Sequence, residues 1–156
     1  MAEHDHNLCI RDALGAAEAL CARRGARLTD LRRRVLELVW QSHRPVGAYD
    51  LLARLGEGRD RAAPPTVYRA LDFLMEQGLV HRIHSLNAFV GCPSAREGHA
   101  ARFLICTACG EATEFEDESL QGDLARIAAD RGFRIDGQVI ELQGLCGRCV
   151  PEQPGA

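Results

Sequence analysis

The sequence predicts an α+β fold in two parts, and three observations lead to that class. Apolar residues recur at helical spacing in four segments between residues 8 and 77, which predicts four helices. Two β-rich runs lie within 79–92, and residues 101–156 combine several strand patterns with one helical pattern. Four of the seven cysteines form two CxxC pairs inside the second part, where they predict a small domain anchored by a metal ion.

The first three predicted helices are bounded by residues that cap or stop a helix. Gly25 ends the first, because a residue without Cβ accepts the left-handed backbone of a helix C-terminus. Thr29 is expected to cap the second, which Pro45 stops, and Gly56 ends the third. The apolar stripes are Ile10, Leu14, Ala17 and Cys21 in the first helix, Leu31, Val35, Leu38 and Val39 in the second, and Leu51, Leu52 and Leu55 in the third.

The fourth predicted helix, about 65–77, presents polar side chains opposite its apolar arc. The prolines before Thr66 fix its entry, Thr66 is expected to cap it, and Gly78 to end it. Arg69 projects from the centre of the polar face and Tyr68 from its edge. Such a helix is typical of a recognition helix, which sets its first side chains against base edges and phosphates. The alternative is an ordinary surface helix of an all-α domain.

A β-hairpin, about 79–92, is predicted after the fourth helix. If Leu86 and Asn87 form a two-residue turn, His81 lies directly opposite Cys92, with their side chains about 5 Å apart on one face. Three helices followed by a hairpin predict a winged helix for the first part of the chain.

Charge is unevenly distributed along the chain, whose nineteen basic residues are all Arg. Residues 1–84 hold thirteen Arg against eleven acidic residues, while residues 85–156 hold six against eleven. The basic first part favours contact with phosphates, and the alternative is a solvated helix face. The Arg cluster comprises Arg23, Arg24, Arg27, Arg32, Arg33 and Arg34, of which Arg27, Arg32, Arg33 and Arg34 are the candidates for phosphate contacts.

The two CxxC pairs, Cys106 with Cys109 and Cys146 with Cys149, are typical of one four-thiolate zinc site. Each CxxC turn offers two thiolates, so two turns close a tetrahedral shell and leave no position for water. Such a zinc ion is structural rather than catalytic. The alternatives are two disulfides or a thioredoxin-like redox pair, but a redox motif needs a single CxxC between a strand and a helix.

The span between the CxxC pairs is predicted to be folded, which explains its length. An apolar stripe over 120–128 marks a helix, and Gly132 ends it. Strands are predicted at 102–106, 111–116, 133–135 and 139–142.

Four segments then carry motifs that are specific in combination. They are Pro64–Leu74 (PPTVYRALDFL), Gly78–His81 (GLVH), Leu104–Gly110 (LICTACG) and Gly144–Cys149 (GLCGRC). In these segments the chain resembles the ferric uptake regulator family of metal-sensing bacterial repressors, and within that family most closely its zinc uptake regulators. The resemblance extends from about residue 8 to residue 150.

The resemblance implies a winged-helix DNA-binding domain at 1–91, a connection at 92–100 and a dimerisation domain with the structural zinc at 101–156. It also implies a regulatory zinc site at the junction of the domains. Two imidazoles, one thiolate and one carboxylate suit zinc, whereas iron(II) and manganese(II) sensors take more oxygen and nitrogen ligands. Two zinc ions per subunit are therefore expected. The ligands that the resemblance assigns to the regulatory zinc are His81, Cys92, His99 and Glu114.

Each regulatory ligand has a structural alternative. His81 would be a surface histidine of the hairpin, Cys92 a small buried apolar residue, His99 a loop residue and Glu114 a solvated strand position. His84 and Glu111 are the nearest substitutes for a misassigned ligand. Cys21 belongs to an apolar stripe and is expected in the core, whereas Cys9 has no assigned role. His4 and His6 are interpreted as part of an N-terminal tail.

The expected function is zinc-responsive repression of zinc-uptake genes by a homodimer bound to a pseudo-palindromic operator in double-stranded DNA. Thr66, Tyr68 and Arg69 are the candidates for contacts from the recognition helix. No apolar run of membrane-spanning length and no signal peptide is found, which favours a cytoplasmic protein without membrane or small-molecule partners.

Two alternatives to this function remain. The nearer one is an iron or other metal sensor of the same family, although Ala100–Phe103 stands where iron sensors are rich in His and Asp. The farther one is a zinc hydrolase. Four protein ligands leave no vacancy for catalysis, and the chain has no HExxH or GxSxG motif, so we do not expect an enzyme.

Overall fold

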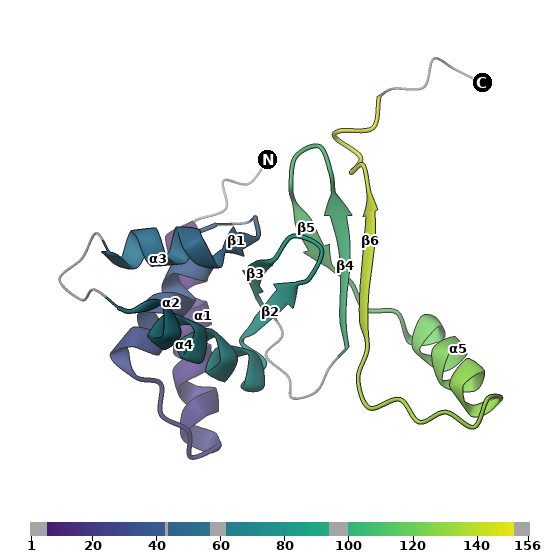
Figure 1. Ribbon diagram of the computed structural model, residues 1–156, viewed down its shortest axis with the longest axis horizontal. Coiled ribbons are helices and arrows are strands. Elements are labelled where there is room, and N and C mark those ends of the chain that lie inside the picture. The colour runs from purple at the N-terminus through teal and green to yellow at the C-terminus, as the bar shows by residue number, and fades with distance from the viewer. Residues whose placement is uncertain (1–5, 43, 57–61, 94–99, 152–156) are drawn as a thin grey trace. The chain divides into compact units, whose positions relative to one another are not determined.

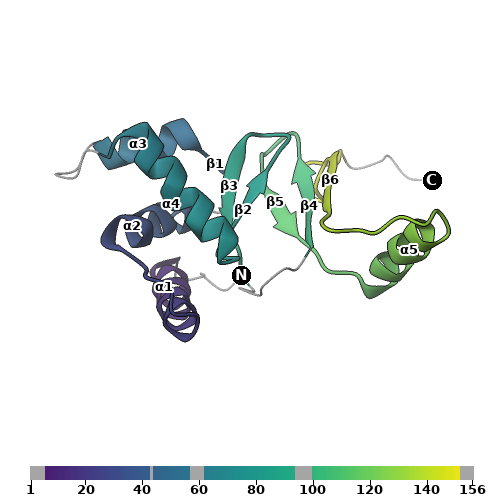
Figure 2. The same ribbon diagram turned by 60° about the horizontal axis from the view of Figure 1, so that its bottom comes forward.

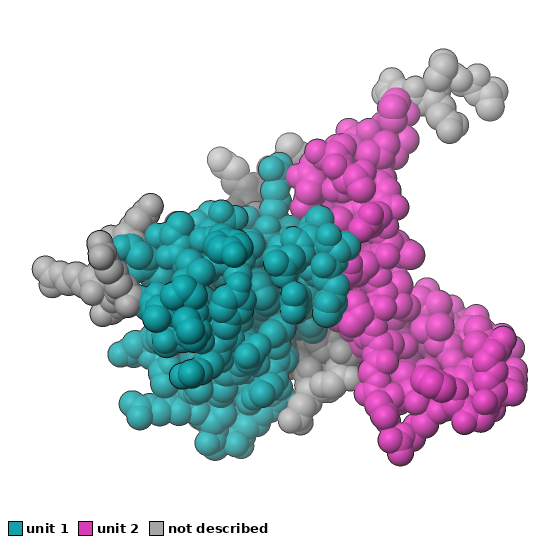
Figure 3. Space-filling model, in the orientation of Figure 1, with its two compact units in different colours: residues 1–99 teal, residues 100–156 magenta. Residues whose placement is uncertain are grey.

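Two units, residues 1–99 and 100–156, make up the chain in the computed structural model (Figure 3). The structure describes all residues except 1–5, 43, 57–61, 94–99 and 152–156. The predicted connection, 92–100, lies mostly outside the described residues, as does His4 of the predicted tail. His6, assigned to the same tail, is instead the first residue of helix α1 (His6–Arg23), so that prediction was wrong.

The described residues of unit 1 form four helices and a small sheet (Figure 1). Strand order in the sheet is β1-β3-β2, and all its pairs are antiparallel. Figure 2 shows the four helices gathered together, with β2 and β3 running side by side next to α4. The elements are α1 (His6–Arg23), α2 (Asp30–Trp40), β1 (Val46–Gly47), α3 (Ala48–Gly56), α4 (Pro64–Glu76), β2 (Val80–Ile83) and β3 (Ala88–Gly91).

The predicted cap of α2 and the predicted glycine stops after α1 and α4 are confirmed. Thr29 caps α2, since its side-chain oxygen accepts a hydrogen bond of 3.4 Å from the backbone N–H of Arg32. Gly25 and Gly78, after α1 and α4, have φ angles of 65° and 70°, which only glycine adopts without strain. The core lies between the apolar faces of the four helices, where Val35, Leu36, Leu51, Val67, Leu71 and Leu74 are fully buried.

The start of α4 differs from the prediction. The helix begins at Pro64, its N-cap is Ala63, and Thr66 lies inside the first turn instead of capping it. Proline suits this first helical turn because the missing N–H would have no intrahelical partner there. The predicted cap at Thr66 was therefore wrong, and its exposed side chain is left on the surface of the first turn.

The hairpin of unit 1 also differs in register. The loop between β2 and β3 spans four residues, 84–87, with Asn87 in the left-handed region at φ 46°, instead of the predicted two-residue turn. His81 consequently pairs with Val90 rather than with Cys92, so that prediction was wrong. Because the shift is an even number of residues, His81 and Cys92 still share one face of the hairpin as diagonal neighbours.

In unit 2, the residues that the structure describes form a three-stranded sheet and one helix, α5. Strand order is β5-β4-β6, with β4 antiparallel to β5 and parallel to β6. The predicted strand at 133–135 was wrong, because a parallel crossover from α5 to β6 requires a connecting segment there, and Phe133 is 67% exposed. The elements are β4 (Ala101–Cys106), β5 (Ala112–Glu114), α5 (Glu118–Ala129) and β6 (Val139–Gly144).

The helices were also compared with the length and hydropathy that a membrane span requires. Among the described residues, no helix is both long enough and apolar enough to cross a membrane.

Candidate metal centres and nucleic-acid interface

The four cysteines of the CxxC pairs come together at one end of the sheet of unit 2. Cys106 is the last residue of β4, and its partner in the parallel register is Gly144, the last residue of β6. Both CxxC turns therefore leave the sheet at the same end of neighbouring strands. All four sulfur atoms lie within 4.8 Å of one another, and each cysteine carries a free thiol.

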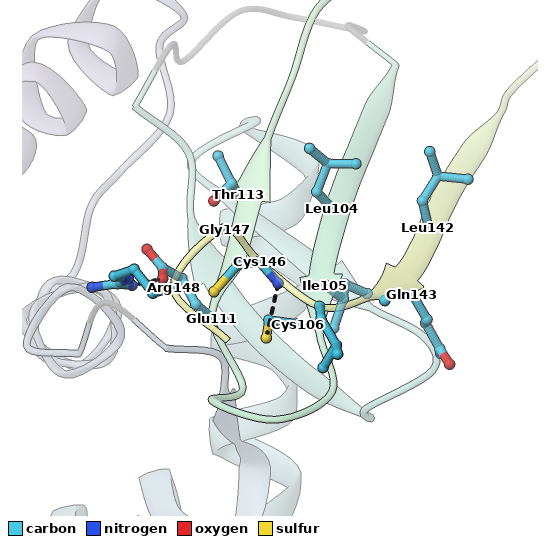
Figure 4. Close-up of a pocket in the computed structure, with 12 residues that line it drawn as sticks. Leu104, Ile105, Cys106, Glu111, Thr113, Leu142, Gln143, Cys146, Gly147 and Arg148 are labelled. Atoms are coloured by element: carbon cyan, nitrogen blue, oxygen red, sulfur yellow. Dashed lines mark hydrogen bonds and ion pairs between the residues drawn. The ribbon is translucent and has the colours of Figure 1, made fainter. Parts of the chain in front are cut away.

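Backbone hydrogen bonds hold the two turns in place. The N–H of Thr107 donates to the carbonyl of Gly144 at 2.8 Å, which ties the first turn to the end of β6. The N–H of Cys146 donates to the sulfur of Cys106 at 3.3 Å (Figure 4). Each turn closes on itself through the N–H of Gly110 to the carbonyl of Cys106 and that of Val150 to the carbonyl of Cys146, both 2.9 Å long.

The spacing of the sulfurs fits a tetrahedral zinc ion. A Zn–S bond of about 2.3 Å places two sulfurs of a tetrahedron about 3.8 Å apart. The sulfurs of Cys109 and Cys146, one from each turn, lie 3.8 Å apart. The donor set and its geometry can therefore hold one zinc ion in a closed shell.

The thiol pKa values show why this cluster needs a cation. Backbone N–H groups of Cys109 and Cys146 lower the pKa of Cys106 to about 6. The thiol of Cys149, hydrogen-bonded first of all to Cys146, has its pKa raised to about 12. Four thiolates repel one another at this distance, so they ionise together only when a metal ion supplies compensating positive charge.

An ion pair spans the same end of the sheet. Arg148, inside the second CxxC turn, pairs with the carboxylate of Glu111 (Figure 4). Glu111 was the alternative to Glu114 as a ligand of the regulatory zinc. Glu111 is thus engaged within unit 2, while Glu114 is the last residue of β5.

A second group of metal-binding side chains begins in the hairpin of unit 1. Cys92 follows β3, and its N–H donates to the carbonyl of Leu79 at 3.0 Å, which extends the pairing of the strands. The ligand atoms of Cys92 and His81 lie within 4.8 Å of each other, and Cys92 is buried. His84 lies in the exposed loop of the hairpin instead. His99, a third sequence-predicted ligand, falls outside the described residues.

The first two turns of α4 present the predicted recognition side chains to solvent. Tyr68 is 43% exposed, and Thr66 and Arg69 are also exposed. In the described part of the chain, Arg69 takes part in no ion pair. One residue escaped the sequence analysis, namely Tyr49 in the first turn of α3, which is 81% exposed. The sequence feature that could have identified Tyr49 is an aromatic residue next to Asp50 on the polar face of a short helix.

The four candidate arginines for phosphate contacts differ in their surroundings. The guanidinium of Arg32 stacks on the ring of Phe73 at 3.6 Å and donates to the carbonyl of Arg27 at 2.6 Å, so it is engaged within unit 1. Arg33 forms an ion pair with Glu18, and Arg34 one of 2.8 Å with Glu37. Both pairs are on the surface, where such interactions are weak and a phosphate can replace the carboxylate.

Comparison with known proteins places this fold and these motifs in a family. The family model described as the ferric uptake regulator family matches residues 23–143, which include α4, the hairpin and the first CxxC pair. The chain belongs to the ferric uptake regulator family.

Relatives within the ferric uptake regulator family differ in their similarity to this chain. The zinc uptake regulation protein of Escherichia coli (strain K12) is 43% identical over 141 residues, which cover 90% of this chain and 82% of that protein. The ferric uptake regulation protein of the same strain is 30% identical over 132 residues, covering 83% and 88%. A solved structure of a zinc uptake regulator complexed with zinc and DNA is 42% identical, with a TM-score of 0.86, and covers 90% of this chain and 95% of that chain.

Proposed function

We propose that this chain is a zinc-responsive, DNA-binding repressor of zinc-uptake genes that acts in the cytoplasm. Identity to the zinc uptake regulation protein exceeds identity to the ferric uptake regulation protein of the same bacterium, 43% against 30%. The observation that carries the proposal is the closeness of the ligand atoms of Cys92 and His81, which lie within 4.8 Å of each other in unit 1, because a thiolate beside an imidazole suits zinc better than iron(II).

Two zinc ions per subunit have separate roles in this proposal. Cys106, Cys109, Cys146 and Cys149 hold a structural zinc. Their closed four-sulfur geometry supports that role, since no position remains for water or substrate. The chain therefore acts as a regulator rather than as an enzyme.

The regulatory zinc is held by His81, Cys92, His99 and Glu114. When bound, the ion would supply a divalent positive charge without redox chemistry. His81 and Cys92 belong to the hairpin that follows α4, and Glu114 belongs to β5 of unit 2. Ligands drawn from both units restrict motion between them in the zinc-loaded protein. Because the restricted state is the one that binds operator, zinc and DNA each raise the affinity for the other.

Operator recognition is carried by α4. This helix enters the major groove with Thr66, Tyr68 and Arg69, whose side chains are exposed on its first two turns. Arg69 is the candidate for a guanine edge, the commonest specific pairing of arginine. Arg27, Arg33 and Arg34 contact phosphates. Tyr49, exposed at the start of the preceding helix, is an additional candidate for DNA contact.

A second copy of the chain packs against unit 2 and forms a homodimer with it. On the described strands, β6 is an edge of the sheet, and Leu104, Leu142 and Leu145 are each about half exposed at 49%, 52% and 48%. Leu104 and Leu142 are neighbours in the parallel register and point to the same face (Figure 4). An apolar face beside an open edge favours a homodimer, which would present two recognition helices to a pseudo-palindromic operator.

Operator binding measured against buffered free zinc tests metal, partner and coupling together. The full chain should bind operator DNA in a zinc-dependent manner and release it when zinc is chelated. Iron(II) and manganese(II) at matched free concentrations serve as controls. Activation by iron(II) but not by zinc would establish the iron-sensor alternative, and no metal dependence would contradict the regulatory site.

A further inference from the structure

Arg102 is the only buried charged side chain in the described part of the chain. It lies on β4 and is 4% exposed. Leu104, two residues further and on the same face of the strand, is 49% exposed. This face of β4 is therefore covered at Arg102 and again at Cys106, which is 4% exposed, and open between them at Leu104.

The guanidinium of Arg102 joins β4 to the N-terminus of α5. Its NH1 group donates to the carbonyl of Asp117, the N-cap residue of α5, at 3.0 Å. Its NH2 group donates to the side-chain oxygen of Gln121 in the first turns of the helix. That same oxygen accepts a second hydrogen bond of 2.7 Å from the amide of Gln138, just before β6. Three segments of unit 2 therefore meet at one polar cluster, which we call the Arg102 clasp (Arg102, Asp117, Gln121 and Gln138).

Apolar packing contributes little to the position of α5. Of its twelve residues only Ala128 is buried, while Ile127 remains 42% exposed. Leu120 and Leu124 are only partly buried, so the helix gains less from the hydrophobic effect than one with a fully buried apolar stripe. The hydrogen bonds of the Arg102 clasp are accordingly the main polar contacts between the described residues of α5 and the sheet.

The choice of arginine has a cost that an apolar residue would avoid. In the described part of the chain, the Nε of Arg102 is buried and has no hydrogen-bond partner. An unsatisfied buried donor costs about 1–3 kcal/mol. The structural reason for an arginine at this position is therefore the pair of hydrogen bonds that its NH1 and NH2 groups donate to Asp117 and Gln121. In the sequence, Asp117 stands between two further acidic residues, Glu116 and Glu118.

We propose that Arg102 is a positioning residue whose built-in positive charge fastens α5 to the sheet and so sets the apolar surface that a second copy covers. The proposal rests on the homodimer of the proposed function. The Arg102 clasp joins three segments, as a bound metal ion can, but its positive charge is the guanidinium group of Arg102 itself. The clasp itself therefore needs no metal ion, although unit 2 as a whole depends on the four-cysteine zinc.

The test uses the full zinc-loaded chain and compares Arg102→Met, which keeps the length of the side chain without its charge, with Arg102→Lys. Arg134→Met is the matched control, because it removes one arginine of unit 2 whose side chain is 86% exposed. Two quantities are measured for each variant: amide hydrogen exchange over residues 118–129 and the dimer dissociation constant by sedimentation equilibrium. Zinc content and far-UV circular dichroism verify that the four-cysteine site and the fold are retained.

Arg102→Met should accelerate exchange in α5 and raise the dimer dissociation constant at least about tenfold, equivalent to about 1.4 kcal/mol. Arg102→Lys should recover part of both effects, and Arg134→Met should show neither. Exchange and dimerisation equal to the unchanged chain in Arg102→Met would overturn the proposal.

Should Arg102→Met not fold, Gln138→Leu provides the same test with Arg102 in place, because it removes the second donor to Gln121. It should give a smaller increase of exchange in α5, and unchanged exchange would contradict the clasp. A wild-type chain that is monomeric would refute the homodimer, whereas exchange in α5 would still decide whether the clasp holds the helix.

Discussion

The backbone of Gly91 lies directly against the indole ring of Trp40. A Cβ atom added at Gly91 would stand 2.4 Å from Cε2 and 2.5 Å from Nε1 of that ring, closer than side chains approach one another. Trp40 is the last residue of α2, and Gly91 is the last residue of β3, immediately before Cys92. This contact therefore packs the helical layer of unit 1 against the strand that leads to the proposed regulatory thiolate.

Gly91→Ala should destabilise unit 1 by about 1–3 kcal/mol, because the added methyl group forces the indole or the strand to move. Urea unfolding followed by tryptophan fluorescence measures this directly, since Trp40 is the single tryptophan of the chain. Gly15→Ala is the control with the opposite sign. Gly15 lies inside α1 with open space around it, so alanine should stabilise that helix by up to about 1 kcal/mol. Equal stability of the two variants would contradict the close contact at Gly91.

Local signals predicted the helices of unit 1 well, and non-local pairing explains what they missed. Thr29 acts through its side-chain oxygen, and Gly25 and Gly78 act through their positive φ angles. These interactions are local, so the roles of all three residues are visible in the sequence. The two-residue strand β1 exists only because Val46 and Gly47 pair with β3, about forty residues later in the chain. A strand of two residues is too short to be predicted from hydrophobic periodicity. The hairpin register depended on Asn87 adopting positive φ in a four-residue loop, which the absence of an Asn-Gly turn left open.

Arg32→Met should lower stability without a matching loss of operator affinity. The variant removes a cation–π contact with Phe73 that joins α2 to α4, which is worth about 0.5–2 kcal/mol. Arg27→Met is the comparison, because Arg27 is exposed and is proposed to contact phosphate. Thermal unfolding and operator binding at two salt concentrations separate the two residues. A weaker salt dependence of binding in Arg32→Met would instead assign Arg32 to the phosphates.

The candidate sites differ in how far the sequence could define them. The four cysteines were predictable because two CxxC turns each fix a local geometry, and the parallel register of β4 and β6 then brings them together. His81 and Cys92 required the register of a hairpin, which was predicted with the correct face but the wrong partner. The Arg102 clasp has no sequence signature, since its side chains come from three segments that only the tertiary fold assembles.

Arg69→Ala should weaken specific operator binding by about 1–3 kcal/mol while zinc affinity stays near normal. The side chain is exposed on α4, so its removal leaves the packing of the helix intact. Affinities for operator and for an unrelated duplex, measured at one salt concentration, distinguish loss of base contact from loss of phosphate contact. An equal loss on both duplexes would make Arg69 a phosphate ligand rather than a base-reading residue.

Cys106→Ser should abolish the fold of unit 2. A structural zinc contributes about 10–16 kcal/mol of apparent binding free energy at neutral pH, and a serine hydroxyl does not replace a thiolate ligand. Zinc stoichiometry and circular dichroism of the full chain measure the loss. Cys9→Ser, which changes a thiol on α1 outside the cluster, is the control and should retain both zinc and fold. A Cys106→Ser chain that keeps its dimer and its zinc would show that the cluster is not structural.

Cys92→Ser should give the opposite pattern, a folded dimer that has lost zinc-dependent operator binding. Serine nearly matches the volume of the buried thiol, and Cys92 packs at the end of β3 without belonging to the four-cysteine cluster. The structural zinc should therefore stay bound while the stoichiometry falls from two ions to one per subunit. Operator titrations at buffered free zinc, run beside the dimer dissociation constant, separate regulation from folding. Unfolding of Cys92→Ser would show that this second site is structural as well. Zinc bound there would then not regulate operator binding.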